Sequence, residues 1–122
     1  MGDVSKNFSR REFACKCGCG FDAVDVDLLN GLQALRDNSG RAITITSACR
    51  CESHNKKVGG ASKSLHVKAK AADIVIQGLT PKEMAALAEQ VPQFQKGAII
   101  TYIKKGFIHV DVRSNRYRET LN

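Results

Sequence analysis

The spacing of apolar residues along the chain predicts two principal helices. The first begins after Asp22 or Asp25, either of which can cap a helix, and ends before Gly40. Its inward face would carry Val26, Leu29 and Leu32, and Leu28 and Leu35 can join them. The second helix opens at the capping box of residues 80–83, with Pro81 at the first helical position. Its apolar face would hold Met84, Leu87, Ala88 and Val91.

Short apolar runs of β-strand length separate and follow these helices. Residues 42–46 and 71–76 are expected to be strands, and residues 98–103 and 107–112 to form a hairpin across 104–106. Residues 8–13 suggest a short turn or helical piece, 52–70 a long polar loop that would line a site, and 113–122 a polar tail. The chain, residues 1–122, therefore predicts a single domain of the α+β class with a core from Phe8 to Arg113. A small, mainly antiparallel sheet would be flanked by the two helices.

Composition and charge narrow the class of partner. The 122 residues are 43% hydrophobic, and no apolar run reaches the roughly 18–20 residues that span a membrane. The formal net charge of +7 predicts attraction to polyanions. With aromatic residues at 6% and no Trp, the sequence carries no nucleic-acid-binding motif. Binding to an anionic cell wall explains the charge as well as binding to nucleic acid does. A third interpretation is that the excess Lys and Arg simply keep the domain soluble.

Three residues form a candidate metal site: His66, Asp73 and His109. Two imidazoles and one carboxylate suit zinc, and three protein ligands leave one tetrahedral position open for water. Asp73 interrupts an apolar strand, where an unpaired carboxylate would cost several kcal/mol. Read singly, Asp73 could make turn hydrogen bonds, His66 could be a solvated loop residue and His109 a core histidine. Their combination favours a zinc site on the sheet face.

The same residues carry a family resemblance. Ser64-Leu65-His66, an aspartate seven positions after that histidine, and the distant His109-Val110-Asp111 resemble the zinc D-Ala-D-Ala carboxypeptidase family of metallopeptidases. Residues 45–55 are similar to that family's Ser-Gly-Tyr-Arg segment. The likeness runs from about Phe8 to Arg113 and is nearest to short, single-domain phage-type enzymes that cut peptidoglycan peptides. Departures from the pattern affect loops: Ala69 stands where glycine is usual, and Ala48-Cys49 replaces Gly-Tyr.

The resemblance implies roles for further residues. Arg50 would polarise the scissile carbonyl or bind a substrate carboxylate, a task that suits the fixed fork of a guanidinium. Ser64 would position the substrate, and His54 in the same loop could contact it. Alternatively, Arg50 could be an exposed loop arginine and His54 a solvated loop histidine, neither with a role in the site.

The sequence offers more than one candidate for the catalytic base. The position three before His109, where relatives carry an acid or histidine, is Gly106. Asp111 is the nearest available carboxylate, because strand alternation projects it to the same face as His109. It could be the base, or it could hold His109 in place, and Glu52 is a more distant candidate.

Three functions follow as expectations. The first is a zinc-dependent peptidase acting on peptidoglycan stem or cross-bridge peptides, either a D,D-carboxypeptidase or an endopeptidase. The second is a zinc-containing wall-binding or virion module without catalysis, and the third a nucleic-acid-binding zinc protein. No signal peptide is visible, so a monomeric, endolysin-like enzyme released after synthesis in the cytoplasm is expected. The five cysteines would be free thiols as made, although one disulfide or a second metal site is open.

Overall fold

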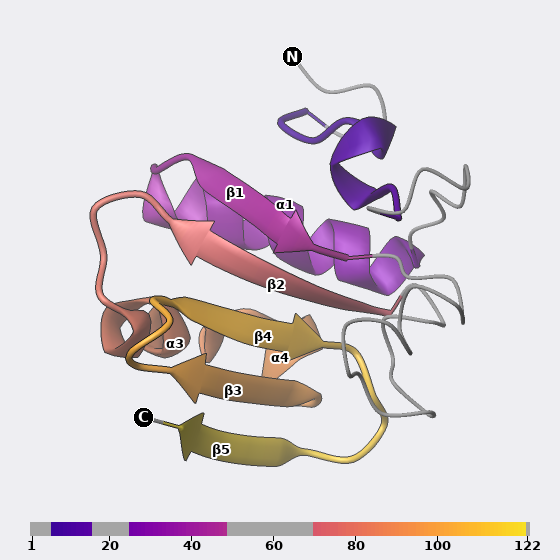
Figure 1. The fold of residues 1–122 in the computed structure, drawn as a ribbon. Coiled ribbons are helices and arrows are strands. Elements are labelled where there is room, and N and C mark those ends of the chain that lie inside the picture. Colours follow the sequence, from indigo (N-terminus) through magenta and orange to yellow (C-terminus); the bar gives the residue numbers. More distant parts are fainter. Residues whose placement is uncertain (1–5, 16–24, 49–69, 122) are drawn as a thin grey trace.

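The computed structural model describes residues 6–15, 25–48 and 70–121 (Figure 1). Within these residues, five strands form one sheet with three α-helices and a short 3-10 helix, so the expected α+β class is confirmed. The elements in chain order are η1 (Arg10–Phe13), α1 (Val26–Ser39), β1 (Ile43–Ser47), β2 (Ala71–Ile76), α3 (Pro81–Ala88), α4 (Pro92–Gln95), β3 (Ala98–Tyr102), β4 (Phe107–Asp111) and β5 (Tyr117–Leu121).

Helix α1 begins at Asp25, whose carboxylate accepts hydrogen bonds from the backbone N–H groups of residues 27 and 28. It ends at Gly40, which has a φ of 63° and therefore takes the left-handed conformation that glycine tolerates best. The buried face carries Leu28, Leu32 and Leu35, of which Leu32 was predicted to face inward and the other two were predicted as possible additions. Leu29, also predicted to face inward, is only partly buried against the core. Val26 departs from that prediction, since 68% of it is exposed. It occupies the first helical position, which lies on the solvent side of the helix once residues 28, 32 and 35 face the sheet.

The capping box before α3 forms as predicted. The Thr80 side chain accepts from the Glu83 N–H, and the Glu83 carboxylate accepts from the Thr80 N–H. Met84 and Ala88 are buried, while the side chain of Leu87 is half-buried. The four-residue helix α4 was not predicted, because one helical turn is too short for an apolar period; it places Phe94 in the core.

The strand order in the sheet is β1-β2-β4-β3-β5. The first three pairings along this order are antiparallel, and the hairpin of β3 and β4 forms where the sequence predicted it. Strand β5 is parallel to β3 and lies in the segment expected to be only a polar tail. Its residues are mostly exposed and carry no apolar alternation, so nothing local marked it as a strand.

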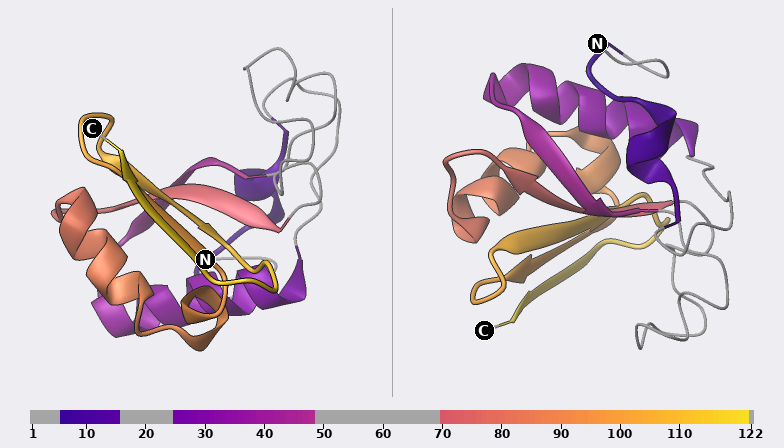
Figure 2. Two further views of the ribbon diagram at one scale, coloured as in Figure 1. Left: turned by 90° about the horizontal axis from the view of Figure 1, so that it is seen from below. Right: turned by 45° about the horizontal axis from the view of Figure 1, so that its top comes forward.

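The described α-helices cover one face of the sheet, and none of them lies on the other face. Helices α1, α3 and α4 lie on the same side of the sheet (Figure 2). Alternate strand residues such as Ile74, Ile108 and Val110 are fully buried against them. The residues between these, including Asp73 and His109, therefore project from the opposite face. Asp73 and His109, two of the three candidate ligands, lie on that open face.

Candidate metal centre

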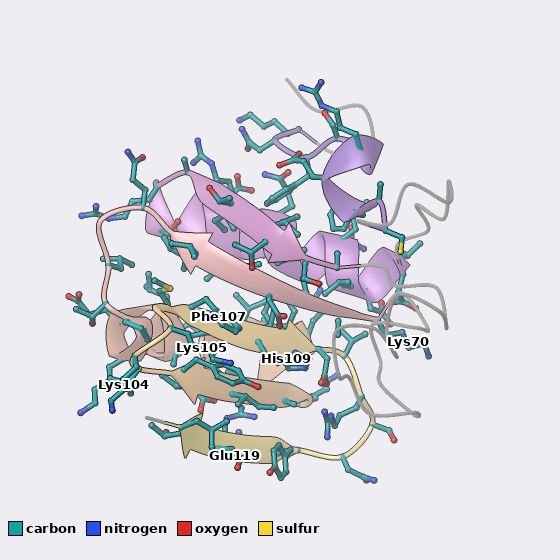
Figure 3. All side chains as sticks on the ribbon, in the orientation of Figure 1. Lys70, Lys104, Lys105, Phe107, His109 and Glu119 are labelled. Atoms are coloured by element: carbon teal, nitrogen blue, oxygen red, sulfur yellow. The ribbon has the colours of Figure 1, made fainter. Side chains whose placement is uncertain are left out.

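Asp73 and His109 are direct cross-strand neighbours on β2 and β4. Direct partners on one face of an antiparallel pair bring their side chains together. Asp73 Oδ1 lies 3.0 Å from His109 Nδ1, and each side chain is 12% exposed. Figure 3 shows His109 on the open face of β4, on the same face as Phe107 and away from the hairpin turn that carries Lys104 and Lys105.

The edge strand β1 helps to place Asp73. A register shift between Ile45 and Ser47 brings Ser47 opposite Asp73. The Thr46 hydroxyl then donates to the Asp73 carbonyl at 3.1 Å. A bulge of this kind commonly redirects a side chain beside a functional site.

Asp111 lies behind His109 and is fully buried, with a side-chain exposure of 0%. Its Oδ2 is 2.8 Å from His109 Nε2, so His109 stands between two carboxylates. The Asp111 carboxylate also accepts from the backbone N–H groups of Ala98 and Arg113 and from the Arg113 guanidinium. The hydrogen-bonding capacity of this carboxylate is thus filled by the protein itself.

These contacts shift two pKa values. Burial alone would raise the pKa of Asp111, but hydrogen bonds from His109 and Arg113 outweigh burial and lower that pKa to about 2. Burial alone would lower the pKa of His109, yet its hydrogen bonds to Asp111 and Asp73 leave that pKa above its usual value. Asp111 is therefore ionised at neutral pH, and His109 Nε2 must carry a proton to donate to it.

The arrangement fits a zinc ion. Two ligand atoms about 2.0–2.1 Å from one tetrahedral zinc are separated by roughly 3.3 Å. The 3.0 Å between Asp73 Oδ1 and His109 Nδ1 is close to that separation. In metal sites a ligating histidine commonly donates its other ring N–H to a carboxylate, as His109 does to Asp111. Among residues 6–15, 25–48 and 70–121, no group of three His, Cys, Asp or Glu residues that could by itself hold a metal is found.

The remaining predicted site residues lie outside the described residues. These are the third candidate ligand His66, the predicted catalytic and substrate-binding residue Arg50, the substrate-binding candidates Ser64 and His54, and the alternative base Glu52. Of the cysteines, Cys15 is described and is buried. The structure thus brings together Asp73, His109 and Asp111, the members of the predicted site that it describes.

Two residues that support the site were not predicted from the sequence. Arg113, assigned to the start of the tail, binds the Asp111 carboxylate through Nε and Nη2. An arginine two positions after a strand aspartate shares its face, and this pattern could have identified the pair. Gly97 was also missed: a Cβ added there would collide with the Asp111 carbonyl, so glycine lets the start of β3 approach the end of β4.

The residues of this site lie in a segment of the sequence that matches a known protein family. Comparison with proteins of curated function returned no match. No helix in the described part of the chain is long and apolar enough to cross a membrane. Residues 6–111 match the family model described as Peptidase M15, which covers most of the chain and both described candidate ligands. The match agrees with the resemblance to D-Ala-D-Ala carboxypeptidases found in the sequence, and it implies that the protein is a peptidase. The chain belongs to the Peptidase M15 family.

Proposed function

We propose that the protein is a zinc-dependent peptidase that hydrolyses stem or cross-bridge peptides of peptidoglycan at a D-amino-acid bond. The observation that carries the proposal is the cross-strand pair of Asp73 and His109, held from behind by Asp111, in a chain of the M15 family. A D,D-carboxypeptidase and an endolysin-like endopeptidase are the two forms of this activity.

The zinc ligands in this proposal are His66, Asp73 and His109. Bound zinc would supply a Lewis acid that polarises the scissile carbonyl and acidifies water. The protein prepares two of the ligands in advance. Strand pairing fixes Asp73 opposite His109, and the His109 Nε2–H bond to Asp111 leaves Nδ1 on the Asp73 side of the ring.

Asp111 acts in this proposal by positioning His109. A general base must reach the proton that it accepts, either directly or through one water. The Asp111 carboxylate has no exposed surface, has a pKa of about 2, and is filled by hydrogen bonds from His109, Ala98 and Arg113. These properties suit a permanent anion that orients a ligand, and they disfavour a proton shuttle. Glu52 is then the acidic candidate that remains from the sequence.

The substrate contacts rest on the family resemblance. Arg50 would polarise the scissile carbonyl or bind a substrate carboxylate, and Ser64 and His54 would position the peptide. The net charge of +7 supports attachment to the anionic wall, without sequence-specific binding of nucleic acid or insertion into a membrane. We propose a monomer that acts on the wall after release from the cytoplasm or as part of a virion.

Mass analysis of products from purified peptidoglycan tests the activity. The zinc-loaded protein should release D-alanine or cross-bridge fragments, a chelator should stop the release, and added zinc should restore it. Asp73→Ala is the matched inactive variant, since it removes a ligand from the open face and leaves the buried face intact. Release that a chelator leaves unchanged, or that Asp73→Ala retains, would contradict the zinc mechanism.

A second function is a wall-binding module that retains zinc without catalysis. Two observations favour it: Gly106 stands where relatives carry the acid before the last histidine, and the Asp111 carboxylate is fully occupied. This alternative predicts zinc binding and wall affinity with no product from either purified walls or permeabilised cells. Lysis of cells when the protein is exported would exclude it.

A further inference from the structure

A pocket of about 350 Å³ lies where the chain leaves β4, beside α4 and the first turn of α1. It is lined by Asp27, Pro92, Gln93, Lys96, Val112, Arg113 and Ser114. Neither the zinc proposal nor the family resemblance assigns a role to it. It is nevertheless connected to the site, because Arg113 lines the pocket and holds Asp111, which in turn binds His109.

The charged groups of the pocket are of both signs. Arg113 is 34% exposed and uses Nε and Nη2 to bind Asp111, whereas Nη1 takes no part in those bonds. Lys96 adds a second cation, and the exposed carboxylate of Asp27 adds an anion. Two cations and one carboxylate around one small pocket favour a ligand that carries both charges, with the negative charge toward Lys96 and Arg113.

Gln93 adds a buried acceptor. Its Oε1 is shielded from solvent and, in the part of the chain that the structure describes, has no hydrogen-bond partner. Buried polar atoms are rarely left unpaired, and an orphaned one calls for an explanation. An amide oxygen accepts and cannot donate, so the missing partner is an N–H or O–H group. A simple anion would not satisfy it.

We propose that this pocket binds a zwitterionic amino-acid group, with the carboxylate on Lys96 and Arg113 and the ammonium on Asp27 and, once the Gln93 side chain rotates toward the pocket, on Gln93 Oε1. The inference deepens the proposed function and rests on it, since such a group would belong to the wall peptide being cut. Free amino-acid ends of this kind occur where a diamino acid in a stem peptide is not cross-linked. Occupation of Arg113 would also reach the metal site through Asp111.

Three probes with similar carbon chains separate the charges: meso-diaminopimelate carries both groups, pimelate only the carboxylates, and cadaverine only the ammonium groups. Each is titrated into the zinc-loaded full-length chain and followed at the backbone amide signals of Gln93, Lys96 and Ser114. Because an amino-acid group can also coordinate zinc, the titration is repeated with the Asp73→Ala variant, which lacks one of the proposed zinc ligands. Signals that still shift in this variant report the pocket and not coordination of the metal. We expect diaminopimelate to shift these signals, with the two single-charge probes binding at least about tenfold more weakly. Unmoved signals, or pimelate binding as tightly as diaminopimelate, would overturn the proposal.

Variants locate the binding. Lys96→Ala and Gln93→Leu should each weaken diaminopimelate binding by about tenfold, which corresponds to the loss of one charged hydrogen bond. Gln93→Leu should also leave the melting temperature unchanged or higher, because it removes an unpaired buried acceptor. Lys82→Ala removes an exposed lysine of α3 that does not line the pocket and should leave binding unchanged. If Lys82→Ala weakened binding as much as Lys96→Ala, binding would depend on the overall positive charge and not on the pocket, and the proposal would be overturned.

The outcome is separable from that of the proposed function. If no wall peptide is cut but the pocket binds diaminopimelate, the peptidase proposal fails and the pocket stands. If peptides are cut and Lys96→Ala changes neither KM nor diaminopimelate binding, the pocket proposal fails and the peptidase stands. If both hold, Lys96→Ala should raise KM for peptides with a free amino-acid end and leave kcat nearly unchanged.

Discussion

Replacing Asp111 by Asn should weaken both the fold and the metal site. The substitution keeps the shape of the side chain but removes the charge that Arg113 and His109 share. Asparagine also offers an amide N–H₂ group to neighbours that are themselves donors. The lowering of the Asp111 pKa from 3.8 to about 2 corresponds to a stabilisation of the ionised form by about 2 kcal/mol. Because Asp111 is fully buried, solvent cannot replace the lost contacts.

We therefore expect Asp111→Asn to lower the free energy of unfolding of the metal-free protein by about 2 kcal/mol, measured by urea denaturation. For a domain of this size the melting temperature should fall by roughly 6–10 °C. Competitive titration with a chelator should show zinc affinity reduced about 10- to 100-fold, which is typical for loss of the partner that orients a metal ligand. Glu119→Gln is the matched control. It neutralises an exposed carboxylate on β5 that accepts from the Tyr117 hydroxyl, and its effect should stay below about 0.5 kcal/mol.

Two results would refute this reasoning. An Asp111→Asn protein as stable as the Glu119→Gln control would mean that the buried charge does not stabilise the fold. Complete loss of zinc would mean that Asp111 is itself a ligand and does not act through His109.

The remaining predictions concern the metal ligand Asp73, the protonation of His109, and Arg118 on the edge strand β5. Asp73→Ala should abolish zinc binding in a metal analysis, whereas Asp111→Ala should leave weak binding, because only the first substitution removes a ligand. The raised pKa of His109 means that its protonated form stabilises the metal-free fold at low pH. That stabilisation should fade in urea titrations as pH rises through this pKa, while zinc affinity, which requires an unprotonated ring nitrogen, should increase over the same range. Arg118→Ala should cost about 1–3 kcal/mol of unfolding free energy. The guanidinium binds both Glu89 carboxylate oxygens, at 2.6 and 2.7 Å, and the Gly97 carbonyl, at 2.8 Å, and Arg118→Lys should restore only part of the loss.

Local patterns in the sequence were sufficient for most of the elements. Capping residues marked the starts of α1 and α3, and apolar runs located β1 to β4, because these signals act over a few neighbouring residues. Alternation along β4 also established that His109 and Asp111 share a face. Where a segment lacked such a signal, as α4 and β5 did, the sequence did not reveal it. Strand β5 is held by its pairing with β3 and by Arg118, which binds the carboxylate of Glu89 at the C-terminal end of α3.

The arrangement of the site was decided by tertiary structure. Sequence suggested that Asp73 and His109 belong together, but they lie 36 positions apart in the chain, and their direct pairing depends on the register between β2 and β4. A shift of one residue would turn Asp73 toward the apolar face, and only packing of the whole sheet against the helices excludes that shift. Spacing alone likewise could not decide whether Asp111 is the catalytic base or orients His109, because it places Asp111 near His109 in either case. Burial and the contacts of Arg113 and Ala98 distinguish them, because a carboxylate shielded from water and filled with hydrogen bonds can orient a ligand but is poorly placed to exchange protons.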